Sequence, residues 1–99
     1  MNMDNQVIML RKYYINEINR IYEQKFQMRL MVVMLFDQNT YSNSLKSIEV
    51  TSSIIESACV DCNPKRILKY LVLLRTIIDD LIEQTDRDYI KIWENKLTH

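Results

Sequence analysis

The first third of the chain has apolar residues in a helical pattern. Between about Asp4 and Phe36, apolar residues recur every seven positions, and others between them widen the stripe to a full helix face. The recurring positions are Val7, Tyr14, Ile21, Met28 and Leu35. Polar residues fall on the other face, and this spacing is typical of an amphipathic helix rather than of a strand. The pattern therefore predicts one long helix over 4–36.

A run of turn-forming residues, Asp37–Asn43, ends this pattern. The next segment, about Ser44–Cys62, has its mainly apolar positions at alternating steps of three and four, and it is rich in serine and threonine. These positions are Leu45, Ile48, Ser52, Ile55, Cys59 and Cys62. The spacing predicts a shorter amphipathic helix, which β-branched residues between 48 and 55 weaken.

A second loop precedes the last segment. Asn63 is a suitable N-cap, and Pro64 suits the first position of a helix. The apolar positions that follow share one face: Leu71, Leu74, Ile78, Leu81, Tyr89 and Ile92. Thr85 is a candidate cap for a separate final helix, but no glycine or proline lies near it. The sequence therefore favours one long helix over Pro64–Leu97, with a split near Thr85 as the alternative.

The chain contains no glycine and one proline. Most tight hairpins need glycine at positive φ, so the composition favours an all-α fold. Ninety-nine residues form a single domain, 1–99. Two helices of about 30 residues would each be ~45 Å long, whereas a compact domain of this size has a radius of gyration of ~13 Å. We expect a small bundle of long, short and long helices that dimerisation completes.

Two segments are apolar on nearly every side, Leu30–Phe36 and Ile67–Leu74. A helix of this kind has to be buried on every side, which three helices do not easily achieve for two segments. The segments either form the centre of the domain's own core or contribute to an interface. On the second interpretation, the interface residues are Met28, Leu30, Met31, Met34, Leu35, Phe36, Leu68, Leu71, Val72 and Leu73. We therefore expect a homodimer that also binds another protein.

Charged residues suggest a second interpretation. Thirteen basic and thirteen acidic residues cancel, so the chain lacks the basic excess that drives non-specific nucleic-acid binding. However, Lys65, Arg66 and Lys69 lie at the start of the last helix, where positive side chains and free N–H groups favour an anion. A solvated face is the simpler explanation, and a nucleic-acid-binding regulator is the alternative function. The acidic second half of the last segment matches basic residues of the first, which suggests antiparallel packing of the two, within or between chains.

The two cysteines form a Cys59–Cys62 pair with two residues between them. No βαβ pattern surrounds them, as a thioredoxin-type motif would require. The one histidine is His99, so zinc would need thiolates from two chains. We expect packed, inert cysteines, with a redox pair as the alternative, and neither a metal nor a cofactor.

The sequence offers no catalytic residues. It lacks an obvious general base and any glycine-rich phosphate loop, so we do not expect an enzyme.

The longest apolar run has seven residues, against the ~20 that a membrane span needs. We read no signal peptide, and two cysteines suggest a reducing, intracellular setting, either cytoplasm or nucleus. The Ile, Asn and Tyr content is typical of AT-rich genomes, as in many viruses and low-GC bacteria. The predicted function is that of a helical interaction protein: an adaptor, an inhibitor or an assembly factor.

Overall fold

The computed structural model describes residues 3–98 of the chain. Four helices account for most of them: α1 (Met3–Ile21), α2 (Gln24–Phe36), α3 (Ser42–Val60) and α4 (Pro64–Thr98). No strand occurs in this part of the chain, so the predicted all-α class is confirmed. The molecule measures 61 × 20 × 16 Å, and its radius of gyration is 16.4 Å, which makes it elongated for its length.

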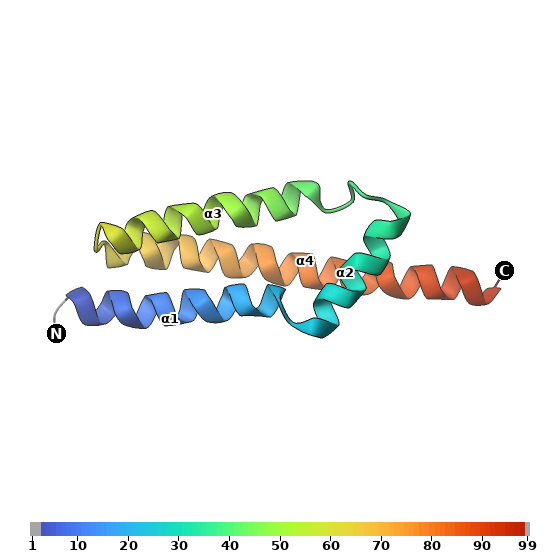
Figure 1. Cartoon of the computed structure of the whole chain (residues 1–99), viewed down its shortest axis with the longest axis horizontal. Coiled ribbons are helices and arrows are strands. Elements are labelled where there is room, and N and C mark those ends of the chain that lie inside the picture. Colours follow the sequence, from blue (N-terminus) through green and yellow to red (C-terminus); the bar gives the residue numbers. More distant parts are fainter. Residues whose placement is uncertain (1–2, 99) are drawn as a thin grey trace.

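Helix α4 runs the whole length of the molecule and is the common partner of the other three helices (Figure 1). α1 and α3 lie along its N-terminal half, α1 parallel to it and α3 antiparallel. α2 crosses the C-terminal half of α4 at a steep angle. Since α1 and α3 pack mainly on α4 and little on each other, the core follows α4.

The buried face of α4 continues through Thr85. Its side chain is fully buried, and its Oγ1 donates a hydrogen bond to the backbone oxygen of Leu81 at 2.7 Å. Thr85 thus occupies a core position instead of capping a new helix, and α4 has no break there. The buried residues of α4 recur at helical spacing: Ile67, Leu71, Leu74, Ile78, Leu81 and Thr85.

The prediction of one helix over 4–36 is wrong, because the chain turns at Tyr22 and Glu23. Glu23 has φ −58° and ψ 127°, which ends the helical path without glycine or proline. After the turn, Phe26 and Val33 are each 4% exposed, whereas Met28 and Leu35 are 52% and 78% exposed. The buried pattern therefore shifts by two positions. The turn allows both segments to bury an apolar face on α4, which one straight helix would not do.

The junction between α3 and α4 was predicted in part. Asn63 Oδ1 accepts a hydrogen bond from the Arg66 N–H at 3.2 Å, and Pro64 is the first residue of α4, so the predicted N-cap is confirmed. Cys62 has φ 53°, in the left-handed region where helices usually end on glycine. Its N–H donates to Cys59 O at 3.1 Å, and the Asn63 N–H donates to Ala58 O at 3.0 Å. These two bonds form the Schellman arrangement that closes a helix C-terminus.

Ion pairs join α4 to the helices that precede it. Arg20 of α1 pairs with Asp79, and Arg29 Nη1 of α2 lies 2.5 Å from Asp86 Oδ1. Basic residues of the first segment thus meet acidic residues of the last. Within the chain, the predicted antiparallel packing is wrong for α1, since α3 provides the reversal and leaves α1 and α4 parallel.

Candidate functional site

A groove of about 990 Å³ lies between α1 and the N-terminal half of α4. α1 contributes Met9 and Tyr13, and α4 contributes Leu68 and Val72, all four of them exposed apolar or aromatic side chains. Each of the four neighbours the buried stripe of its own helix, so the groove forms where the two stripes part. Its floor includes Leu10 and Leu71, which are buried.

The rim of the groove is charged, with an excess of positive groups. Lys65 and Arg75 line the α4 wall, and Glu17 lines the α1 wall. Glu17 already forms an ion pair with Arg20, whose Nη1 lies 2.6 Å from Glu17 Oε2. The two cations of the α4 wall therefore dominate the electrostatics of the groove.

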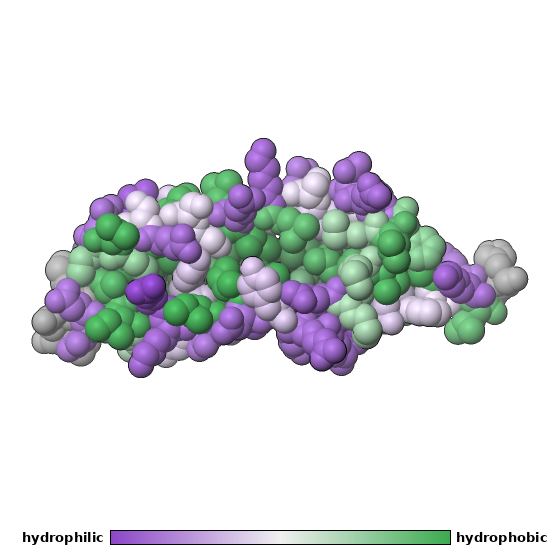
Figure 2. Space-filling view, viewed as in Figure 1, coloured by the Kyte–Doolittle hydropathy of each residue, from purple (hydrophilic) through white to green (hydrophobic). Residues whose placement is uncertain are grey.

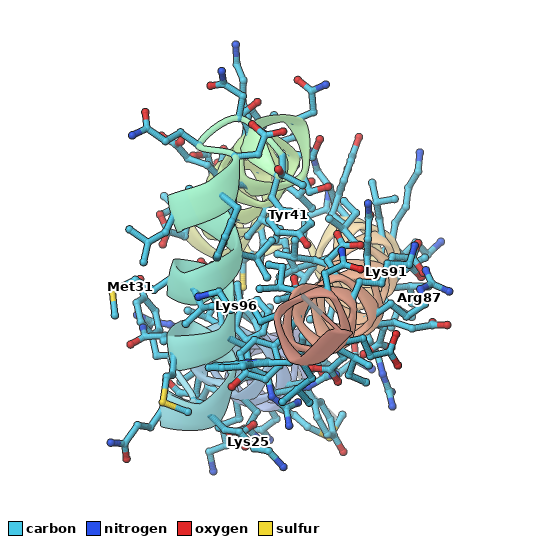
Figure 3. All side chains as sticks on the ribbon, turned by 90° about the vertical axis from the view of Figure 1, so that its right-hand side faces the viewer. Lys25, Met31, Tyr41, Arg87, Lys91 and Lys96 are labelled. Atoms are coloured by element: carbon cyan, nitrogen blue, oxygen red, sulfur yellow. The ribbon has the colours of Figure 1, made fainter. Side chains whose placement is uncertain are left out.

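A second apolar surface lies on the outer side of α2. Met28, Met31 and Leu35 are exposed at steps of three and four, and Figure 3 shows Met31 pointing away from α4. At the end of α2, the ring of Phe36 lies 5.3 Å from the Lys96 ammonium group. Figure 2 shows apolar side chains in several clusters along this face of the molecule, with polar side chains among them.

The ten predicted interface residues fall into separate regions. Of the α2 members, Leu30 and Met34 pack partly against the core. On α4, Leu68 and Val72 line the α1/α4 groove, whereas Leu73 lines a groove of about 590 Å³ between α3 and α4. The predicted residues on α4 belong to its N-terminal half, whereas α2 packs on its C-terminal half. The ten residues therefore do not form one continuous surface.

The side chains of Lys65, Arg66 and Lys69, at the start of α4, lie in three different environments. Lys65 lines the α1/α4 groove, and Arg66 lines a shallow groove along α3. The Lys69 ammonium group lies 5.5 Å from the centre of the Tyr70 ring. The structure therefore does not bring the three together around one common site.

Both cysteines are free and half-buried. Burial raises the pKa of the Cys59 thiol. A hydrogen bond to Asp4 Oδ1, at 3.1 Å, is the main cause that raises the pKa of Cys62. A raised pKa leaves less thiolate at neutral pH, and thiolate is the form that exchanges disulfides and binds metals. Over residues 3–98, no group of three or more His, Cys, Asp or Glu side chains is placed to hold a metal ion.

Sequence reasoning missed the α1 wall of the groove. Met9 and Tyr13 are one helical turn apart and lie outside the heptad positions used to define the α1 stripe. Exposed apolar residues that flank a buried stripe indicate a contact surface, so Met9 and Tyr13 could have been used to predict this wall.

Comparisons with known proteins give no relatives for this chain. No family model matches it, and neither a curated protein nor a solved structure does. Among the described helices, none has the length and apolar content that crossing a membrane requires.

Proposed function

We propose that the protein is a helical interaction module that binds an amphipathic helix of a partner protein in the α1/α4 groove. The observation that carries this proposal is the pairing of Met9 and Tyr13 on one wall with Leu68 and Val72 on the other. Helix-in-groove recognition uses apolar anchors at i, i+3, i+4 and i+7, which insert between two such walls. An adaptor, an inhibitor or an assembly factor works through contacts of this type.

The size of the groove fits a helical occupant. Its walls extend over residues 6–17 of α1 and over the N-cap Asn63 with residues 64–75 of α4. About a dozen helical residues correspond to ~18 Å at 1.5 Å per residue, which is enough for anchors on three successive turns.

The rim favours a partner with acidic flanks. Lys65 and Arg75 border the apolar floor, and the nearby Glu17 is engaged by Arg20. Complementary charge at the edge of an interface speeds association and selects the partner's orientation, while the apolar anchors supply most of the affinity. We therefore expect the preferred helix to carry Asp or Glu beside its apolar stripe.

Selection from a displayed library of amphipathic 18-residue helices tests the proposal. Selected peptides should carry acidic flanks, and Leu68→Glu should weaken their binding at least tenfold, measured by fluorescence anisotropy. Leu35→Glu is the matched control, because Leu35 is an exposed leucine on α2 and lies outside the groove. Loss of binding in both variants, or in neither, contradicts the proposal.

The salt dependence of binding separates this function from nucleic-acid binding. Apolar helix recognition should change little between 50 and 200 mM salt, whereas phosphate contacts lose affinity steeply over that range. Reversal of charge at Lys65, Arg66 and Lys69 should reduce peptide affinity modestly, through Lys65 on the rim. A nucleic-acid shift at low salt that this triple change abolishes would instead favour the regulator.

A further inference from the structure

A second regular pattern runs along the outer side of α4. Its positions follow one another at steps of three, four, three, four and three, and all are exposed. We call them the outer seam: Arg66, Lys69, Leu73, Thr76, Asp80 and Glu83. This spacing is that of the contact positions in a coiled coil. Figure 3 shows Arg87, the next position of the series, on the side of α4 that faces away from α2.

The charges of the outer seam are arranged symmetrically. Arg66 and Glu83 are equally distant from a point between Leu74 and Arg75, and so are Lys69 and Asp80. A two-fold axis through that point reverses the direction of a second α4. It therefore places each basic residue opposite an acidic residue of the other copy, so the same surface is complementary to itself.

These charges do not pair with each other inside one chain. Lys69 and Asp80 are eleven positions apart on one straight helix, a rise of ~16 Å. Acidic residues of α4 on its inner sides have partners on other helices: Asp79 pairs with Arg20, and Asp86 pairs with Arg29. Within the outer side, Glu83 Oε1 lies 3.4 Å from Arg87 Nη1, and this exposed pair leaves Glu83 accessible to a second cation. Asp80 lies on the outer side, where an external cation reaches it.

One of the two central positions of the outer seam is apolar. Leu73 is 46% exposed, and Thr76 is its symmetric counterpart. Leu73 and Thr76 lie on either side of the symmetry point, so an antiparallel second copy would cover Leu73 at the middle of the interface. Apolar contact at the centre with charged pairs outside it is the usual arrangement of a specific interface.

We infer that the protein forms a two-fold symmetric dimer in which the α4 helices of two copies pack antiparallel along the outer seam. In each half of the interface, Lys69 faces Asp80 of the partner subunit, and Arg66 faces Glu83 of the partner subunit. This inference does not rest on the partner groove, because Leu68 and Arg75 face α1 on another side of α4.

Charge reversal at one pair of positions tests the register. Lys69→Glu creates two like-charge contacts per dimer with the partner's Asp80, and Asp80→Lys creates two with the partner's Lys69. Each variant alone should dimerise about tenfold more weakly than the natural chain in sedimentation equilibrium. An equimolar mixture of the two should recover affinity within about twofold, because each mixed pair has opposite charges. Native mass spectrometry should show the mixed dimer in excess over both homodimers.

Two control variants make the result specific. Lys25→Glu reverses an exposed lysine of α2, away from the side of α4 on which Arg87 lies (Figure 3), and should leave dimerisation unchanged. Leu68→Glu should leave it unchanged as well, so failure of the groove proposal and failure of the dimer are distinguishable. A natural chain that stays monomeric to about millimolar concentration, or a mixture that stays as weak as the single variants, overturns the inference.

Discussion

The hydroxyl group of Tyr41 donates a hydrogen bond to Asp88 Oδ2 at 2.5 Å. Tyr41, labelled in Figure 3, belongs to the connection between α2 and α3. The residue is nevertheless only 1% exposed. Its ring packs in the core, and its hydroxyl reaches a carboxylate on the C-terminal half of α4. The loop thereby anchors the start of α3 to the part of α4 that α2 crosses.

Replacement of Tyr41 by phenylalanine removes this hydrogen bond and keeps the ring. A hydrogen bond to a charged acceptor contributes about 1.5–3 kcal/mol, so we expect the free energy of unfolding in urea to fall by about that amount. Tyr13→Phe is the control, because Tyr13 is exposed on α1 and its change should stay within ~0.5 kcal/mol. Equal effects of the two substitutions would show that the Tyr41 hydroxyl contributes no stability.

The same tyrosine should make stability depend on alkaline pH. Burial, followed by the hydrogen bond to Asp88, raises the pKa of Tyr41 to about 12 from an ordinary value of 10.0. Between these values the unfolded chain loses the proton while the folded chain keeps it. The contribution of Tyr41 to the free energy of unfolding is therefore fully present below pH 10 and falls as pH rises toward 12.

Urea titrations at pH 9, 10, 11 and 12 check this dependence. The Tyr41→Phe variant lacks the titrating group, so its stability should fall less steeply over the same range. The pKa of Tyr14 is also raised, mainly by burial, and contributes a decline of the same sign in both proteins. Parallel curves for the natural chain and the variant would contradict the assignment to Tyr41.

Local features of the sequence were sufficient to predict the N-cap of α4 and the middle of its buried face. Asn63 and Pro64 act within one turn of the helix they begin, so their roles do not depend on the rest of the fold. The buried series through Leu74, Ile78 and Leu81 follows from helical periodicity alone. Such features are predictable because neighbouring residues determine them.

The groove and the turn after α1 depend on tertiary packing instead. The sequence indicated Leu68 and Val72 as surface residues for contact, but it did not indicate that α1 lies parallel to α4 with Met9 and Tyr13 opposite them. Nothing in the local sequence around Tyr22 and Glu23 requires a turn, since no glycine or proline occurs there. The turn depends on tertiary packing, because it places the face of α2 that carries Phe26 and Val33 against α4.

A double-mutant cycle should measure the attachment of α2 to α4. Arg29 Nη1 lies 2.5 Å from Asp86 Oδ1, and the Arg29 guanidinium group lies 5.7 Å from the centre of the Tyr89 ring. Because both charged groups are partly exposed, we expect a coupling energy of only about 0.5–1 kcal/mol from Arg29→Ala, Asp86→Ala and their combination. Urea unfolding at 0.05 M and 1 M sodium chloride provides the measurement. The coupling should shrink at high salt, and a coupling that salt leaves unchanged would contradict an ion pair.

Cys62→Gly should stabilise the protein. Cys62 has φ 53°, a conformation that costs a residue with a side chain about 1–2 kcal/mol and costs glycine little. The greater freedom of glycine in the unfolded chain and the lost contact with Asp4 offset part of this gain. We therefore expect a net increase of ~0.5 kcal/mol in the free energy of unfolding. Ser57→Gly, at an exposed helical position of α3, should instead lower it by about the same amount. Destabilisation by both substitutions would show that the left-handed conformation at Cys62 carries little strain.

The shift in the buried pattern after Ile21 gives the most direct test of the four-helix arrangement. Phe26 is 4% exposed and Met28 is 52% exposed, whereas a continuous heptad pattern from Val7 would bury Met28. Phe26→Ala should lower the free energy of unfolding by about 3 kcal/mol or more, because it leaves a cavity beneath α2. Met28→Ala should change it by less than ~0.5 kcal/mol, since the side chain already contacts water. Urea unfolding of both variants, with helicity checked by circular dichroism, decides between the two arrangements. A large loss at Met28 with a small loss at Phe26 would restore the single long helix and remove the turn at Tyr22 and Glu23.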